Sequence, residues 1–120
     1  MNTQYIMLGE TVHGQPSGNY DGSSLFFVGT PVKAANFYQG LGNLQTVVIR
    51  VSDFQGIIKL QATLESNPSE ALWFDTDEFG DPFYSSTGVF TFSIRGNFVW
   101  MRPEVIDFTS GTIESITIGY

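Results

Sequence analysis

The chain has 120 residues, of which 42% are hydrophobic and 14% charged, so we expect one folded domain over residues 1–120 rather than a disordered chain. A net charge of −7 with only five scattered basic residues argues against nucleic acid and anionic membranes as partners, because both require dense Lys and Arg. The lack of cysteine excludes disulfides, thiolate catalysis and cysteine-based zinc sites.

The N-terminal third predicts short strands separated by polar loops. Residues 3–8 are typical of a short strand, and residues 13–24 form a polar, Gly-rich loop with an Asp21-Gly22 turn pair. Residues 25–32 begin with an apolar run and predict a second strand. Residues 34–43 then predict another loop.

The middle of the chain has the strongest strand pattern. Residues 44–52 are rich in β-branched side chains, and residues 57–65 alternate between apolar and polar positions. This alternation is typical of an antiparallel strand with one buried face. Residues 53–56, between the two strands, contain Asp and Gly and predict a hairpin turn.

Acidic and aromatic residues follow in a stretch with weaker strand signals. Residues 67–70 predict a turn, and residues 71–74 a short strand or an irregular segment. Residues 75–86 combine Asp, Gly and Pro and predict a loop.

The C-terminal third alternates again. Residues 88–94 predict a strand, and Gly96-Asn97 predicts a two-residue hairpin turn into a strand over residues 97–108. Pro103 lacks an amide donor, so it requires an edge position or a bulge. After a turn at Ser110-Gly111, residues 112–120 predict the last strand.

These elements amount to about eight short strands and no helix. Strands at this spacing, joined by short turns, predict an all-β fold, namely an antiparallel β-sandwich or jelly roll. A closed β-barrel is the alternative architecture.

The sequence offers no recognisable catalytic site. His13 is the only histidine, and nothing near it in sequence marks a triad. Glu65, Glu70, Asp75 and Asp77 could form a glycosidase pair only beside a deep cleft that raises one pKa. We therefore expect a protein that is not an enzyme and uses no cofactor.

The acidic segment DTDEFGD partly matches a calcium-binding loop. Asp75, Asp77 and Asp81 are candidate ligands, because closely spaced carboxylates suit hard cations. However, Phe79 and Ser86 occupy positions where the motif needs oxygen ligands with acidic or amide groups. The expectation is a solvated acidic loop without a metal.

Five aromatic residues lie close together in sequence with few basic neighbours. Aromatic side chains of this kind could stack on sugar rings or anchor a protein interface. They could equally form a small apolar cluster that closes one end of a sandwich. The residues are Trp73, Phe74, Phe79, Phe83 and Tyr84.

Most of the chain resembles small structural proteins of tailed bacteriophages, including cyanophages. The most specific stretch is FQGIIKLQATLE, a turn glycine leading into a strand, followed by a tryptophan. The segments that carry the resemblance are residues 13–24, 54–65 with Trp73-Phe74, 96–102, 108–113 and 116–120. Pro103 departs from the pattern, in which a small or β-branched residue follows the arginine.

The resemblance implies an accessory virion protein: a capsid decoration, neck or tail component made in the host cytoplasm and found in the virion. Its partners would be other virion proteins, in a homo- or hetero-oligomer joined through sheet faces and edge strands. Few charges and many aromatics suit such interfaces. The alternative function is a carbohydrate-binding module that recognises host-surface glycans.

Overall fold

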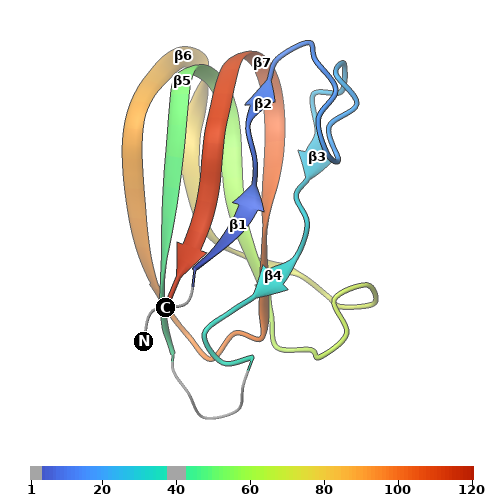
Figure 1. The fold of residues 1–120 in the computed structure, drawn as a ribbon, viewed down its shortest axis with the longest axis vertical. Helices are drawn as coiled ribbons and strands as arrows, with labels where there is room; N and C mark the ends of the chain where they lie inside the picture. The colour runs from blue at the N-terminus through green and yellow to red at the C-terminus, as the bar shows by residue number, and fades with distance from the viewer. Residues whose placement is uncertain (1–3, 38–42) are drawn as a thin grey trace.

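The computed structural model describes residues 4–37 and 43–120, which form an all-β fold of seven strands without a helix (Figure 1). Within these ranges no helix is long and apolar enough to cross a membrane. The strands are β1 (Gln4–Leu8), β2 (Thr11–Val12), β3 (Phe27–Val28), β4 (Val32–Lys33), β5 (Leu44–Thr63), β6 (Phe74–Arg95) and β7 (Trp100–Gly119).

Three long strands dominate the fold, and each is bent over on itself. β5, β6 and β7 have 20, 22 and 20 residues. A straight strand of that length would span about 65 Å, whereas the longest dimension of the molecule is 40 Å. Figure 1 shows each ribbon rising in one layer, passing over the top and descending in the other. Bending therefore turns three strands into two layers.

Layer A is built on the half of β5 before its bend. Residues 44–51 of β5 pair on one side with residues 88–95 of β6, and residues 46–51 pair on the other side with residues 113–119 of β7. β1 and β2 continue the layer beyond β7, and all these pairs are antiparallel.

Layer B is built on the half of β5 after the bend. Residues 56–62 of β5 pair with residues 74–81 of β6, and residues 57–63 pair with residues 100–106 of β7. β3 and β4 pair with the outer side of β7. Both layers therefore place β5 centrally and leave β6 at an edge.

The core lies between the layers. Val47 and Ile49 from layer A and Ile58 and Leu60 from layer B are almost fully buried and belong to one apolar cluster. These residues alternate with outward-facing ones, as the sequence pattern predicts. The all-β, antiparallel β-sandwich or jelly-roll class is thus confirmed, and the barrel alternative is wrong.

Both expected hairpins are wrong. Residues 53–56 join two halves of β5 that lie in different layers and do not pair. Gly96-Asn97 does not join paired strands either, because β5 lies between β6 and β7. In sequence, an Asp or Gly that permits positive φ marks a bend between layers as readily as a hairpin turn.

Two other elements differ from expectation. The predicted loop over residues 75–86 belongs to β6, whose bulges accommodate its Gly and Pro. The predicted strand over residues 25–32 reduces to β3 and the start of β4. The predicted first strand begins at Gln4 within the described range; Thr3 and part of the 34–43 loop lie outside the described residues.

Pro103 lies where β7 faces the break between β3 and β4. The Pro103 carbonyl accepts a 2.8 Å hydrogen bond from the Gly29 amide. The amide and carbonyl of a strand residue point to the same side, so the donor that proline lacks faces this break. The expectation of an edge position holds locally, although β7 as a whole is paired on both sides.

The bend requires glycine where β5 and β7 approach each other. Gly111 has a φ of +91°, and a Cβ built on it would collide with the carbonyl of Asp53, which itself has a φ of +52°. Registers on β5 also shift around Phe54. The two backbones are therefore in contact at the top of the sandwich, with no room for a side chain at Gly111.

We expect Gly111→Ala to lower the free energy of unfolding by roughly 3 kcal/mol or more, because it adds backbone strain to a steric collision. Chemical denaturation monitored by tryptophan fluorescence measures the change. Gly9→Ala is the control: a Cβ at Gly9 meets nothing within 4 Å, so its effect should stay within about 0.5 kcal/mol. Equal effects of the two substitutions would contradict the proposed contact.

Candidate functional site

The five aromatic residues that the sequence singles out do not form one cluster. Phe79 packs inward, with its ring 4.5 Å from that of Phe90 between centroids. Phe83 and Tyr84 lie near the bend of β6 and are 80% and 72% exposed. Phe74, the first residue of β6, contacts Phe98 edge-on. β6 therefore spreads these side chains along its length.

Trp73 lies apart from these contacts, against the outer face of layer B. The guanidinium of Arg102 on β7 lies 4.4 Å from the centroid of a Trp73 ring, a cation–π contact. This contact spans the layer, because β5 separates β6 from β7. It places an indole beside the polar side chains of the central strand.

These polar side chains form two adjacent rows on the outer face of layer B, here named the polar ladder. Each row takes one residue from each of β7, β5 and β6, at positions that the strand register places opposite one another. The rows are Arg102, Gln61 and Asp75, and Glu104, Lys59 and Glu78.

Gln61 connects the ladder. Its Oε1 accepts a 2.9 Å hydrogen bond from Nε of Arg102, and its Nε2 donates to Asp75 Oδ1 at 3.0 Å and to Glu104 Oε2 at 2.7 Å. Gln61 is only 8% exposed. A Gln held by three charged partners fixes the orientation of all three, which rigidifies the face.

A bulge brings Asp75 into the ladder. Leu60 pairs with Asp77, but the next residue, Gln61, pairs with Asp75 rather than Thr76. The extra residue, Thr76, donates its hydroxyl to the Leu60 carbonyl at 2.9 Å. The bulge therefore places a carboxylate, instead of a threonine, opposite Gln61.

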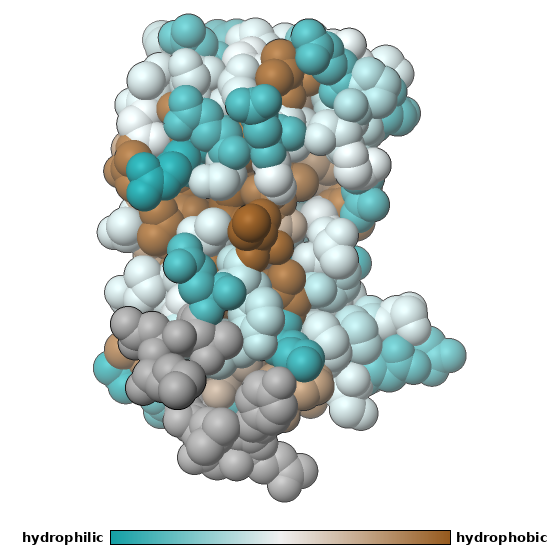
Figure 2. All heavy atoms as spheres, in the orientation of Figure 1, coloured by the Kyte–Doolittle hydropathy of each residue, from teal (hydrophilic) through white to brown (hydrophobic). Residues whose placement is uncertain are grey.

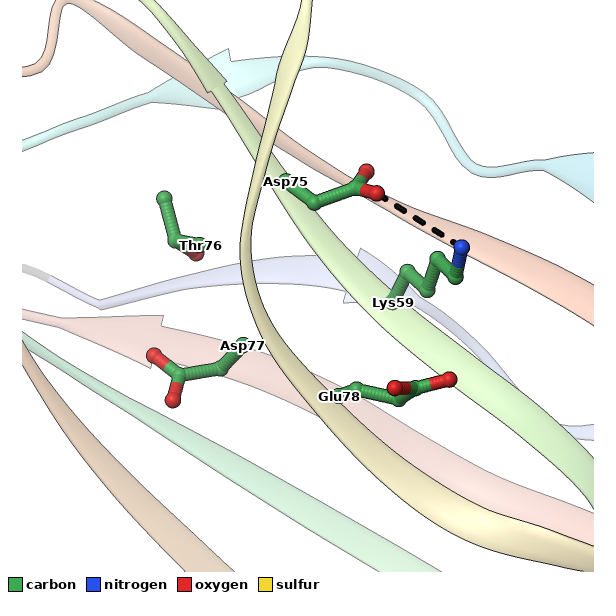
Figure 3. Close-up of a pocket in the computed structure, with 5 residues that line it drawn as sticks. All are labelled: Lys59, Asp75, Thr76, Asp77 and Glu78. Atoms are coloured by element: carbon green, nitrogen blue, oxygen red, sulfur yellow. Dashed lines mark ion pairs between the residues drawn. The ribbon is translucent and has the colours of Figure 1, made fainter.

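A shallow pocket of about 380 Å³ adjoins the ladder, lined by Lys59 and residues 75–78. In Figure 3, the side chains of Lys59, Asp75 and Glu78 extend to one side of β6, whereas Thr76 and Asp77 lie on the other side. Lys59 Nζ and Asp75 Oδ2 form an ion pair at 3.6 Å. The pocket thus offers one ammonium and several carboxylates within one small volume.

Arg102 remains cationic in this setting. Burial lowers its pKa from the ordinary value, and the negative charge of Glu104 opposes that shift. A guanidinium begins with a pKa so high that it stays protonated at neutral pH. The ladder therefore carries two positive charges beside its three carboxylates.

Trp100 extends the aromatic side of this face. Its indole N–H donates to the Ser66 carbonyl at 3.0 Å, and its ring meets Phe37 edge-on at 5.1 Å. The ammonium of Lys33 lies 4.8 Å from the Phe37 ring centroid. These contacts give Trp100 a packing role.

The outer edge of β6 is a second candidate site. Among the described residues, β6 pairs with β5 on one side only. Its layer B half carries Asp75, Asp77, Glu78 and Asp81 and is followed by Pro82, features that discourage pairing with another chain. Its layer A half, residues 86–95, has the sequence STGVFTFSIR, which contains no proline and one charge, that of Arg95 at the end of the strand.

The structure gives several of the catalytic and metal candidates local packing or hydrogen-bond partners. His13 packs edge-on against Phe108, with ring centroids 5.3 Å apart. Glu65 accepts a hydrogen bond from the Leu72 amide, and Asp75 is occupied by Gln61 and Lys59. In residues 4–37 and 43–120, no group of three His, Cys, Asp or Glu side chains is placed to hold a metal ion.

Sequence reasoning missed most of the ladder. Lys59 and Gln61 carry a signal, because the alternation of residues 57–65 puts both on the outward face. Arg102 and Glu104 are two residues apart on β7, which also predicts a shared face. No local pattern, however, indicates that β7 and β6 flank β5.

The polar loop over residues 13–24 is organised by Asp21. Its carboxylate accepts hydrogen bonds from the amides of Ser23 and Ser24, at 2.9 and 2.7 Å, and from the Ser24 hydroxyl at 2.7 Å. These bonds favour the ionised form and lower the pKa of Asp21 from 3.8 to about 2, with the Ser24 hydroxyl as the largest cause. The loop is thus an Asx-type turn.

We expect Asp21 to titrate near pH 2 in the folded protein, measured by NMR of its carboxyl carbon. A depressed pKa means that the turn is stabilised fully above the ordinary value of 3.8 and loses this stabilisation as the pH falls toward about 2. Ser24→Ala removes the largest cause and should raise the pKa. A midpoint near 3.8 in the unmodified chain would contradict the assignment.

The fold and its two sites define the class of protein: a small antiparallel β-sandwich with a polar outer face and an edge strand, β6, that pairs on one side only among the described residues. No protein-family model and no curated protein matches the chain. Among solved structures, the chain is similar to a family 29 carbohydrate-binding module from Piromyces equi, at 16% identity and a TM-score of 0.39, over 98% of this chain and 90% of the other. A likeness this distant says nothing about what this chain binds.

Proposed function

We propose that the protein is a non-enzymatic structural component of a tailed-phage virion, a capsid decoration, neck or tail protein, that joins its neighbours by pairing strands along the layer A half of β6. The observation that supports this proposal is the edge at residues 86–94, which pairs on one side only among the described residues and carries no charge before Arg95 at the end of the strand. Backbone amides and carbonyls on an open edge are a template for another strand.

The two edges of the sandwich differ in how they meet solvent. The edge opposite β6 is divided among β1, β2, β3 and β4, with 5, 2, 2 and 2 residues. Short, interrupted strands are one way in which natural sheets avoid edge-to-edge pairing. β6 instead presents a continuous strand, so it is the edge suited to assembly.

The side chains on the layer A half of β6 also suit an interface. Val89 is 53% exposed, and Thr91 and Ser93 are exposed as well. On the same layer, Ile6 of β1 is 68% exposed. Figure 2 shows apolar side chains gathered across the middle of the visible face, with polar side chains around them. A partner strand on β6 would continue this mixed surface.

Further exposed apolar residues lie outside the β6 edge. Phe83 and Tyr84 lie near the bend of β6, and Leu25 and Phe26 are 52% and 55% exposed in the loop before β3. The Leu25 carbonyl accepts a hydrogen bond from the Phe108 amide near the bend of β7. Exposed aromatics of this kind are enriched at the centres of protein interfaces.

We expect the purified chain to self-associate and the double substitution Val89→Lys and Thr91→Lys to weaken that association about tenfold or more, because two ammonium groups oppose pairing along the edge. Sedimentation velocity over a range of concentrations measures the dissociation constant. Thr30→Lys adds charge at an exposed loop position as the control and should leave association unchanged.

The role in the virion has its own test. An antibody raised against the purified chain should label intact particles of a tailed phage that encodes it, and mass spectrometry of washed particles should contain its peptides. A chain that is present in infected cells but absent from washed particles would refute the virion role, whatever the outcome for self-association.

A further inference from the structure

We propose that the outer face of layer B binds a neutral oligosaccharide, with a sugar ring against Trp73 and its hydroxyl groups on the polar ladder. The proposal does not rest on the assembly role, because it concerns the opposite layer and a sheet face instead of an edge. Three features of the described residues support it: a supported indole, a prearranged set of donors and acceptors, and the balance of charge.

The indole of Trp73 is held from one side. Its contact with the guanidinium of Arg102 ties it to β7, while the side chain remains partly exposed. A pyranose ring has an apolar face of C–H groups that can pack on an aromatic ring, and a rigid aromatic loses little conformational entropy on binding. The contact with Arg102 therefore restricts the indole of Trp73 before a sugar ring packs on it.

The ladder beside Trp73 presents hydrogen-bonding groups of both kinds. Among the described residues, Arg102 bonds to Gln61 through Nε and Glu104 bonds to Gln61 through one carboxylate oxygen, which leaves the terminal guanidinium nitrogens and the other oxygen for a ligand. Lys59 adds a donor in the pocket and Glu78 adds acceptor oxygens. A sugar hydroxyl both donates and accepts, so closely spaced donors and acceptors match vicinal hydroxyls.

The arrangement is in place before any ligand binds. Gln61 is almost buried and holds Arg102, Asp75 and Glu104 through its own hydrogen bonds. Groups fixed in this way do not lose their freedom on binding, which raises the affinity obtained from each contact. The 380 Å³ pocket also falls within the size range of small-molecule sites.

The charge of the face selects a neutral ligand. The ladder has two cations, Arg102 and Lys59, against the three carboxylates of Asp75, Glu104 and Glu78. Each cation already has an acidic or amide partner. A uronic or sialic acid would therefore meet net negative charge, whereas uncharged hydroxyls would not.

The test titrates the ¹⁵N-labelled chain with neutral gluco-, manno- and galacto-configured hexasaccharides, and with an oligogalacturonate of similar length. We expect at least one neutral sugar to shift the indole N–H of Trp73, the side-chain amide of Gln61 and Nε–H of Arg102 together. Trp73→Ala should weaken that binding about tenfold or more, measured by calorimetry. The oligogalacturonate should bind more weakly than the neutral sugar.

Two further variants separate a lost ligand contact from a lost fold. Glu78→Gln keeps the size of an exposed side chain and should weaken binding severalfold without changing the denaturation midpoint. Tyr84→Ala removes a 72% exposed aromatic near the bend of β6, away from the ladder, and should leave sugar binding unchanged.

The edge variant provides the cross-check with the assembly role. Val89→Lys with Thr91→Lys should retain sugar binding, and Trp73→Ala should retain self-association. The sugar site is refuted if none of the neutral sugars shifts the ladder resonances at about 10 mM, a limit set by the weakest useful affinities. It is also refuted if the shifts map to Tyr84 or if the oligogalacturonate binds best.

Discussion

The contact between the backbones of β5 and β7 at the bend determines the rest of the molecule. Asp53 and Gly111 meet there so closely that no Cβ fits on Gly111, and both have positive φ. Bulges of this kind let a long strand change direction without losing its pairing. Because β5, β6 and β7 bend together, one paired unit of three strands folds onto itself and encloses an apolar core between its halves.

One consequence is that each long strand has two different environments. The half of β6 before the bend carries four acidic residues and borders the ladder, whereas the half after it carries a single charge, that of Arg95 at its end. Acidic groups discourage strand pairing but provide acceptors for hydroxyl groups. The same strand can therefore supply a polar ligand face in layer B and a pairing edge in layer A, and the bend keeps the two apart.

The sequence predicts the strands better than their connections. A high content of β-branched residues identifies residues 44–52 as a strand, and alternation identifies residues 57–65 and 88–94, because burial of one face imposes a period of two. It does not distinguish a hairpin from a bend between layers, since both need an Asp or Gly with positive φ. The Asp, Gly and Pro content of residues 75–86 predicts a loop, but these residues belong to a strand, because tertiary pairing with β5 overrides their weak strand propensity.

The candidate site depends on something that no local pattern contains. Lys59 and Gln61 are visibly outward-facing in the sequence, but their neighbours are decided by register, and the register of β6 changes by one residue between Leu60 and Gln61. In a regular register without the bulge, Gln61 would lie opposite Thr76 and would lose its hydrogen bond to Asp75. A register shift of one residue exchanges the side chains on the two faces of a strand. The bulge therefore turns Thr76 toward the Leu60 carbonyl and places Asp75 in the ladder beside Trp73.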